Sequence, residues 1–90
     1  MRKVVELKLK FYIPRYLFCA IAYAVKLVVI DEWERKDAVL QACDFYDACD
    51  PADVMPFVDR VLEELLFRVI EIPDGVKVGE YLKGKNGKEI

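Results

Sequence analysis

The sequence predicts an α+β domain in which a small, mainly antiparallel sheet carries three helices on one face. Three observations lead to this class. Residues 3–12 alternate between apolar and polar side chains, as a half-buried strand does. Residues 16–25 are apolar without a break, which is typical of a buried helix. Two further segments with helical periodicity follow, and strand-like residues return at Phe67.

The length and composition indicate one compact domain. A chain of 90 residues has the size of a single domain. An apolar fraction of 56% beside a charged fraction of 33% is typical of a folded protein with a sharply divided inside and outside. We expect one domain over residues 1–83 and a flexible C-terminal tail over residues 84–90, where glycine and lysine dominate.

The sheet is predicted to contain three strands, with a fourth left open. The strands are Lys3–Tyr12, Phe67–Ile72 and Val76–Leu82, and Pro73-Asp74-Gly75 forms the turn between the last two. Leu27–Ile30 is rich in β-branched residues and fits either a short buried strand or the last turn of the preceding helix. The predicted order is therefore β-α-(β)-α-α-β-β.

The first helix is expected to begin with Pro14 in its first turn, where a missing N–H costs nothing. Because it is apolar on every side, we expect the rest of the domain to enclose it. The alternative is a membrane span. Residues 16–30 fall short of the ~20 residues that a span needs, and Lys26 interrupts them. A buried helix in a soluble domain is the favoured interpretation.

The second helix is predicted from Trp33 to about Ala48, with Asp31 as its N-cap. Its acidic side chains are expected to face water. Its inner stripe is predicted to comprise Val39, Leu40, Cys43 and Tyr46.

The third helix has two overlapping start signals, Asp50 with Pro51 and Asp53 with Pro56. Arg60–Glu64 and Glu64–Arg68 are spaced for ion pairs on the helix surface. Its inner stripe is predicted to comprise Val54, Phe57, Val58, Val61, Leu62, Leu65, Leu66 and Val69.

The composition argues against an enzyme. The chain has no serine, threonine or histidine, so it lacks a hydroxyl nucleophile and the usual base that activates a thiol. Three cysteines cannot complete a Cys₄ zinc site, and we expect them to be buried free thiols in a reducing cytoplasm. The acids spaced by three from Asp44 to Asp53 are interpreted as caps and solvated surface. We therefore predict no catalytic residue, no metal and no cofactor.

The uneven charge is the strongest functional signal. Residues 1–30 carry six basic groups and one acid, whereas residues 31–64 carry eleven acids and three basic groups. Such asymmetry indicates a charged partner. We predict a non-catalytic protein-interaction module, such as a small inhibitor or a nucleic-acid mimic of the kind that mobile elements encode, that binds a basic protein. The predicted binding residues are Asp31, Glu32, Glu34, Asp37, Asp44 and Asp47.

The alternative function is a small nucleic-acid-binding regulator that uses the basic first strand. Its predicted contacts are Lys8, Lys10, Tyr12 and Arg15. The strand-Pro-helix opening resembles ribbon–helix–helix antitoxins, and residues 4–30 with 69–82 resemble the strand–helix–strand plan of Alba-type chromatin proteins. The Lys-Lys expected before the proline in the latter is Tyr12-Ile13 here, and no family is assigned.

A second copy of the chain is a further expected partner. A short sheet leaves unpaired edges, and the apolar content is high, so a homodimer through a sheet edge or an apolar helix face is predicted. No membrane contact is expected.

Overall fold

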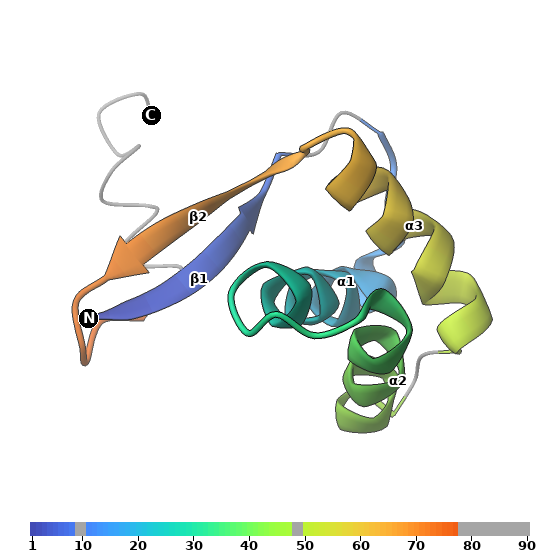
Figure 1. The fold of residues 1–90 in the computed structure, drawn as a ribbon, viewed down its shortest axis with the longest axis horizontal. Coiled ribbons are helices and arrows are strands. Elements are labelled where there is room, and N and C mark those ends of the chain that lie inside the picture. Colours follow the sequence, from blue (N-terminus) through green and yellow to red (C-terminus); the bar gives the residue numbers. More distant parts are fainter. Residues whose placement is uncertain (9–10, 48–49, 78–90) are drawn as a thin grey trace.

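The computed structural model describes residues 1–8, 11–47 and 50–77, and it confirms a small α+β fold with three helices. The helices lie against one another, and the two strands form an antiparallel ribbon that extends away from them (Figure 1). The elements in chain order are β1 (Arg2–Leu7), α1 (Arg15–Val29), α2 (Arg35–Phe45), α3 (Pro51–Glu63) and β2 (Phe67–Ile72).

The sheet is smaller than predicted, with two strands among the residues that the structure describes. Val4 lies opposite Ile70, and Val5 lies opposite Val69. The predicted first strand stops at Leu7 instead of Tyr12 because its partner ends there. The Lys8 N–H donates to the Leu66 carbonyl at 2.7 Å, and Leu66 lies in the connection between α3 and β2, outside the strand.

The predicted third strand is not confirmed. Val76 and Lys77 lie outside a strand, and the rest of that prediction, like the tail at 84–90, falls outside the described residues. Pro73-Asp74-Gly75 does form a turn, in which Gly75 has a φ of 85°. This left-handed conformation favours glycine, which has no Cβ to clash.

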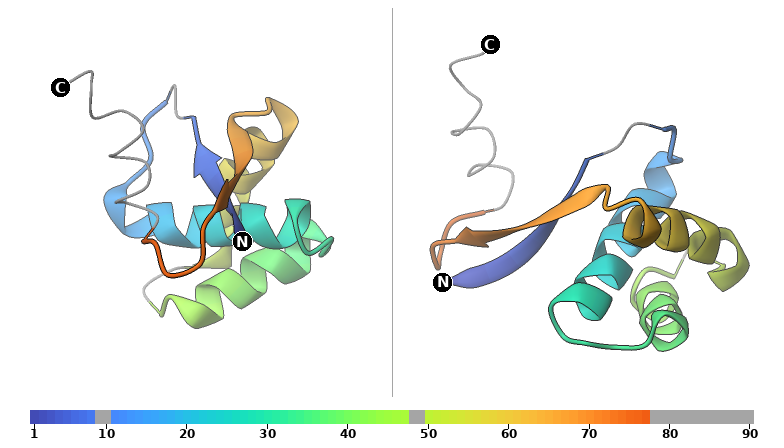
Figure 2. Two further views of the ribbon diagram at one scale, coloured as in Figure 1. Left: turned by 90° about the vertical axis from the view of Figure 1, so that its left-hand side faces the viewer. Right: turned by 45° about the horizontal axis from the view of Figure 1, so that its top comes forward.

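Helix α1 is the centre of the hydrophobic core. Ala20, Ile21, Ala24 and Val25 have no exposed surface, and Figure 2 shows α1 between the ribbon and the other helices. Pro14 lies one residue before the helix, and its carbonyl accepts the Leu17 N–H at 3.0 Å. The open question about residues 27–30 is settled as helix, because Leu27 to Val29 form the last turn of α1.

The prediction that α1 is enclosed on every side is wrong. Phe18 is 38% exposed, and Cys19 is exposed as well. Helices α2 and α3 cover one side of α1, and the inner face of the ribbon contributes Val5 and Leu7 against the core. The ribbon diverges from α1 towards its free end (Figure 1), and the exposed Phe18 and Cys19 show that part of α1 is uncovered.

Helix α2 is shorter than predicted and starts later. Glu34, not Asp31, is the N-cap, and no side chain caps the helix. The chain reverses between α1 and α2, where Glu32 takes a φ of 62° and the Trp33 N–H donates to the Leu27 carbonyl at 3.0 Å. Glu32 and Trp33, which the sequence pattern places at the start of the second helix, therefore belong to this reversal.

The inner stripe of α2 is partly as predicted. Val39 and Cys43 are buried, but Leu40 is 48% exposed. The small residues Ala38 and Ala42 are buried in its place, because alanines allow α2 to approach α1 closely.

Helix α3 begins as the first of its two start signals predicts. The Asp50 side chain accepts the Ala52 N–H at 2.9 Å, and Pro51 occupies the first helical position. Pro56 therefore lies inside the helix. Val54, Val58 and Val61 are fully buried, as predicted, and the predicted Arg60–Glu64 pair forms at 2.8 Å. Arg68 pairs instead with Glu6 across the ribbon, because β2 has begun there.

Helix α3 ends before the predicted apolar stripe does, because its last residue is Glu63 and the stripe was predicted to continue to Val69. Leu65 takes a φ of 53° and is 72% exposed, and the Leu66 N–H donates to the Val61 carbonyl at 3.0 Å. This is the Schellman arrangement, in which the left-handed residue is usually glycine. The stripe predicted through Leu65, Leu66 and Val69 thus ends before Leu65.

We predict that Leu65→Gly raises the free energy of unfolding by up to about 1 kcal/mol, because glycine removes the Cβ clash of a left-handed leucine. Urea denaturation measures the change. Leu65→Ala is the matched control, since it shortens the exposed side chain but keeps the Cβ. A glycine variant no more stable than the alanine variant contradicts the prediction.

Candidate functional site

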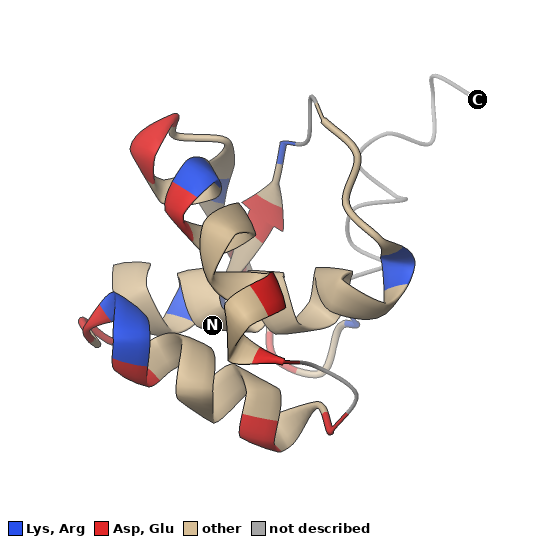
Figure 3. Ribbon diagram, turned by 90° about the vertical axis from the view of Figure 1, so that its right-hand side faces the viewer, with Lys and Arg blue, Asp and Glu red and all other residues tan. Residues whose placement is uncertain are grey.

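The six predicted acidic residues are all exposed, and we call them the acidic face: Asp31, Glu32, Glu34, Asp37, Asp44 and Asp47. Three lie in the connection between α1 and α2, two on α2, and one just beyond its C-cap. Figure 3 shows acidic segments towards both ends of α2.

Two members of the acidic face share the outer side of α2. Asp37 and Asp44 are seven residues apart, which places them on the same side of the helix and about 10.5 Å apart along its axis. Leu40 lies between them with 48% of its surface exposed. The outer side of α2 therefore presents an apolar side chain between two carboxylates.

The remaining members are less closely grouped. Asp31 lies 3.8 Å from the Lys26 ammonium, so it is associated with the end of α1. Glu32 and Glu34 precede α2, and Asp47 follows it. The structure thus places the acidic face around one helix without gathering it into a single cluster.

Two acids of α3 are compensated by an arginine of α2. Arg35 contacts Asp59 at 3.2 Å and Glu63 at 3.3 Å, and so links the start of α2 to α3. Within the described part of the chain, Asp37, Asp44 and Asp47 have no ion pair. Among the described residues, carboxylates without an ion pair therefore lie on α2 and on both sides of it, and Asp53 in the first turn of α3 is also without one.

The position of Asp44 is electrostatically unfavourable. It lies in the last turn of α2, where the helix dipole presents its negative end, and that turn contains no basic side chain. Asp37 lies in the first turn, where the dipole favours negative charge. The two carboxylates share one side of the helix but have opposite relations to its dipole.

The basic residues of the alternative function lie around the connection from β1 to α1. Lys8 and Arg15 are exposed, and Tyr12 is 82% exposed. Lys10 falls outside the described residues. Nucleic-acid binding by these side chains stays a prediction.

The other candidate chemistries find no built site in the described ranges. No group of three or more His, Cys, Asp or Glu side chains there is arranged to hold a metal ion, and no polar or charged side chain is buried. None of the helices there has the length and apolarity that crossing a membrane requires. Cys43 is buried as expected, Cys19 is exposed contrary to expectation, and Cys49 is not described.

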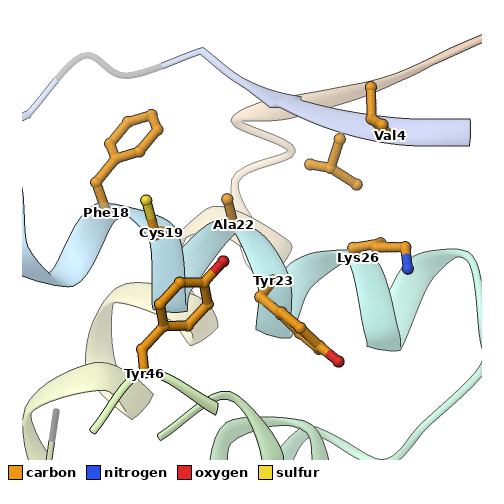
Figure 4. Close-up of a pocket in the computed structure, with 8 residues that line it drawn as sticks. Val4, Phe18, Cys19, Ala22, Tyr23, Lys26 and Tyr46 are labelled. Carbon is orange, nitrogen blue, oxygen red and sulfur yellow. The ribbon is translucent and has the colours of Figure 1, made fainter. Parts of the chain in front are cut away.

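An open apolar trough of about 290 Å³ lies between β1 and α1 (Figure 4), and no pattern in the sequence predicts it. The continuous apolar run of α1 predicts a helix that is enclosed on every side, which leaves no room for such a trough. Lys26, the one charge among residues 16–30, marks the side of α1 that meets solvent, and Ala22 lies one turn before it. The trough is lined by Val4, Val5, Phe18, Cys19, Ala22, Tyr23, Lys26 and Tyr46.

Aromatic side chains form the wall of the trough near the end of α2. The rings of Tyr23 and Tyr46 lie 6.0 Å apart edge to face, and Phe45 packs against both at about 5 Å. Burial raises the pKa of the Tyr46 phenol above its ordinary value of 10.0, and the neighbouring Cys19 and Tyr23 raise it further. Tyr46 therefore keeps its proton in the fold at pH values where a free phenol loses it.

No family model, curated protein or solved structure matches this chain.

We predict that stability falls as the pH rises above 10 because of Tyr46. The folded state holds the phenolic proton more tightly than the unfolded state, so unfolding is favoured between the unfolded and the folded pKa. Phenolate absorbance and urea denaturation across pH 9 to 12 measure the effect. Tyr46→Phe removes this phenol and should flatten the pH dependence, and an unchanged curve in that variant contradicts the assignment.

We also predict that two like substitutions on α2 change stability in opposite directions. Asp44→Asn should raise the free energy of unfolding by about 0.3–1 kcal/mol at low ionic strength, whereas Asp37→Asn should lower it by a similar amount. The two variants have equal net charge, so each is the control of the other. Denaturation at low and high salt measures both effects, and a change of the same sign in both variants contradicts the dipole argument.

Proposed function

We propose that the chain is a non-catalytic protein-interaction module whose acidic segment, residues 31–64, binds a basic surface on another protein. The observation that carries this proposal is Asp44, a carboxylate at the disfavoured end of α2 without a basic side chain in its turn. A positive surface docked on α2 supplies the missing counter-charge.

The partner class follows from the chemistry of the acidic face. Spaced carboxylates around one helix offer acceptors to Lys and Arg side chains, as nucleic-acid phosphates do. The module then acts as a small inhibitor or nucleic-acid mimic, and its target is a protein with a basic, nucleic-acid-binding surface. Leu40 adds an apolar contact at the centre of the interface.

A homodimer through a sheet edge or an apolar helix face stays a prediction. It is compatible with the acidic module, since the acidic face needs no second copy to be exposed.

A pull-down with charge-reversal variants tests the proposed function. The immobilised protein should retain a basic protein from lysate at low salt and release it as salt screens the contact. Asp44→Lys with Asp47→Lys should abolish retention. The matched control is Glu71→Lys with Asp74→Lys, which makes the same change in net charge on β2 and the turn after it, where both side chains are exposed.

Two results contradict the proposal. One is equal retention by the wild type and the Asp44/Asp47 variant. The other is a shifted DNA or RNA band at low salt that Lys8→Ala with Arg15→Ala removes, which supports the nucleic-acid-binding alternative instead.

A further inference from the structure

The trough between β1 and α1 has the shape of a small ligand site. It follows α1 from Phe18 to Lys26, a span of eight residues or about 12 Å along the helix. Figure 4 shows Cys19 and Ala22 on α1 facing β1 across the opening, with Phe18 towards one end and Lys26 towards the other. Tyr46, at the C-cap of α2, reaches the same space.

The lining is apolar along its length and cationic at one end. Valine, alanine and aromatic side chains make up most of it, and Lys26 is its one charged residue. Pockets for small ligands usually combine an apolar lining with a few polar groups that fix the orientation. This lining therefore suits an apolar molecule with one negatively charged end.

The Lys26 ammonium has capacity to bind a further anion. Its nearest carboxylate oxygen belongs to Asp31 at 3.8 Å, which is longer than a hydrogen bond, and both side chains are about 40% exposed. The ammonium also lies 5.9 Å from the centre of the Tyr23 ring. An ammonium group has three donors, so it can donate to a ligand carboxylate beside its weak contact with Asp31.

We propose that the trough binds a medium-chain fatty acid, with the carboxylate at Lys26 and the acyl chain along Ala22 and Cys19 towards Phe18. The volume fits this class. An apolar cavity of ~150 Å³ accommodates a benzene ring, and this trough has about 290 Å³. A saturated acid of about ten carbons fills it and covers the exposed part of Phe18. The proposal does not depend on the acidic face as a binding surface.

A second copy of the chain is a poorer occupant. Two α1 helices packed antiparallel through this strip bring the Arg15 end of one copy towards the Lys26 end of the other. Arg15 then opposes Lys26 at both ends, and these like charges disfavour the contact, while Asp31 beside Lys26 offsets part of the repulsion. A carboxylate is complementary to the same end of the trough.

The test is a titration of the isotope-labelled protein with decanoate, followed by amide NMR below the micelle concentration, with decanol as the uncharged comparison. We expect saturable shifts for Val5, Cys19, Ala22 and Tyr46. Lys26→Met should weaken decanoate binding about tenfold, the loss of one charge-assisted hydrogen bond, and leave decanol binding unchanged. Lys36→Met, on the exposed surface of α2, is the matched control and should bind decanoate as the wild type does.

A second variant tests the trough itself. Ala22→Phe fills its floor and should abolish binding of both probes, with the fold checked by circular dichroism. The proposal is overturned if decanoate shifts no trough residue, if Lys26→Met binds it as tightly as the wild type, or if the same residues shift on dilution because a dimer covers the trough.

Discussion

The close packing of α1 against α2 is the contact on which the rest of the structure depends. Ala20 and Ala24 on α1 and Ala38 and Ala42 on α2 are all fully buried, and side chains this small let two helix backbones approach closely. The larger Ile21 and Val39 fill the space beside them. In a chain of 90 residues that buries a modest core, this contact fixes the direction of α2 and hence the side that α2 turns to solvent.

The placement of charge follows from that packing. No polar or charged side chain among the described residues is buried, so every charge there acts at the surface, where salt screens it. Arg35 takes two acids of α3 as partners and leaves the outer side of α2 with Asp37 and Asp44. The difference between these two acids and Asp59 and Glu63 of α3 therefore arises from the position of Arg35.

The sequence predicted best where the signal is local. Asp50 with Pro51 marks the start of α3, and the spacing of Val54, Val58 and Val61 marks its inner side, because capping and helical periodicity depend on neighbouring residues. The end of α3 could not be predicted, because leucine rarely adopts the left-handed conformation that Leu65 takes just after the helix. The length of β1 was overestimated because a strand extends only as far as its partner, and alternation alone does not show where that partner ends.

In the candidate sites, too, the features that depend on neighbouring residues could be predicted and those that depend on the tertiary fold could not. Exposure of the acidic face could be predicted, since acids on helices of small domains rarely lie inside. Their grouping could not, because Asp31 is held near Lys26 by the chain reversal between α1 and α2, a feature of the tertiary fold. The trough was also beyond prediction from periodicity, since it exists because the ribbon diverges from α1.

That divergence has a physical consequence for the first helix. Val5 and Leu7 of β1 lie against the core, while Val69, the partner of Val5 on β2, is 41% exposed. The ribbon is too narrow to cover the whole of the helix side that α2 and α3 leave open. The fold therefore leaves Phe18 partly exposed, which costs hydrophobic free energy. A ligand or partner that covers this side chain gains that free energy on binding. Lys26 sits at the same opening, so the uncovered strip selects for an occupant that is apolar and carries negative charge.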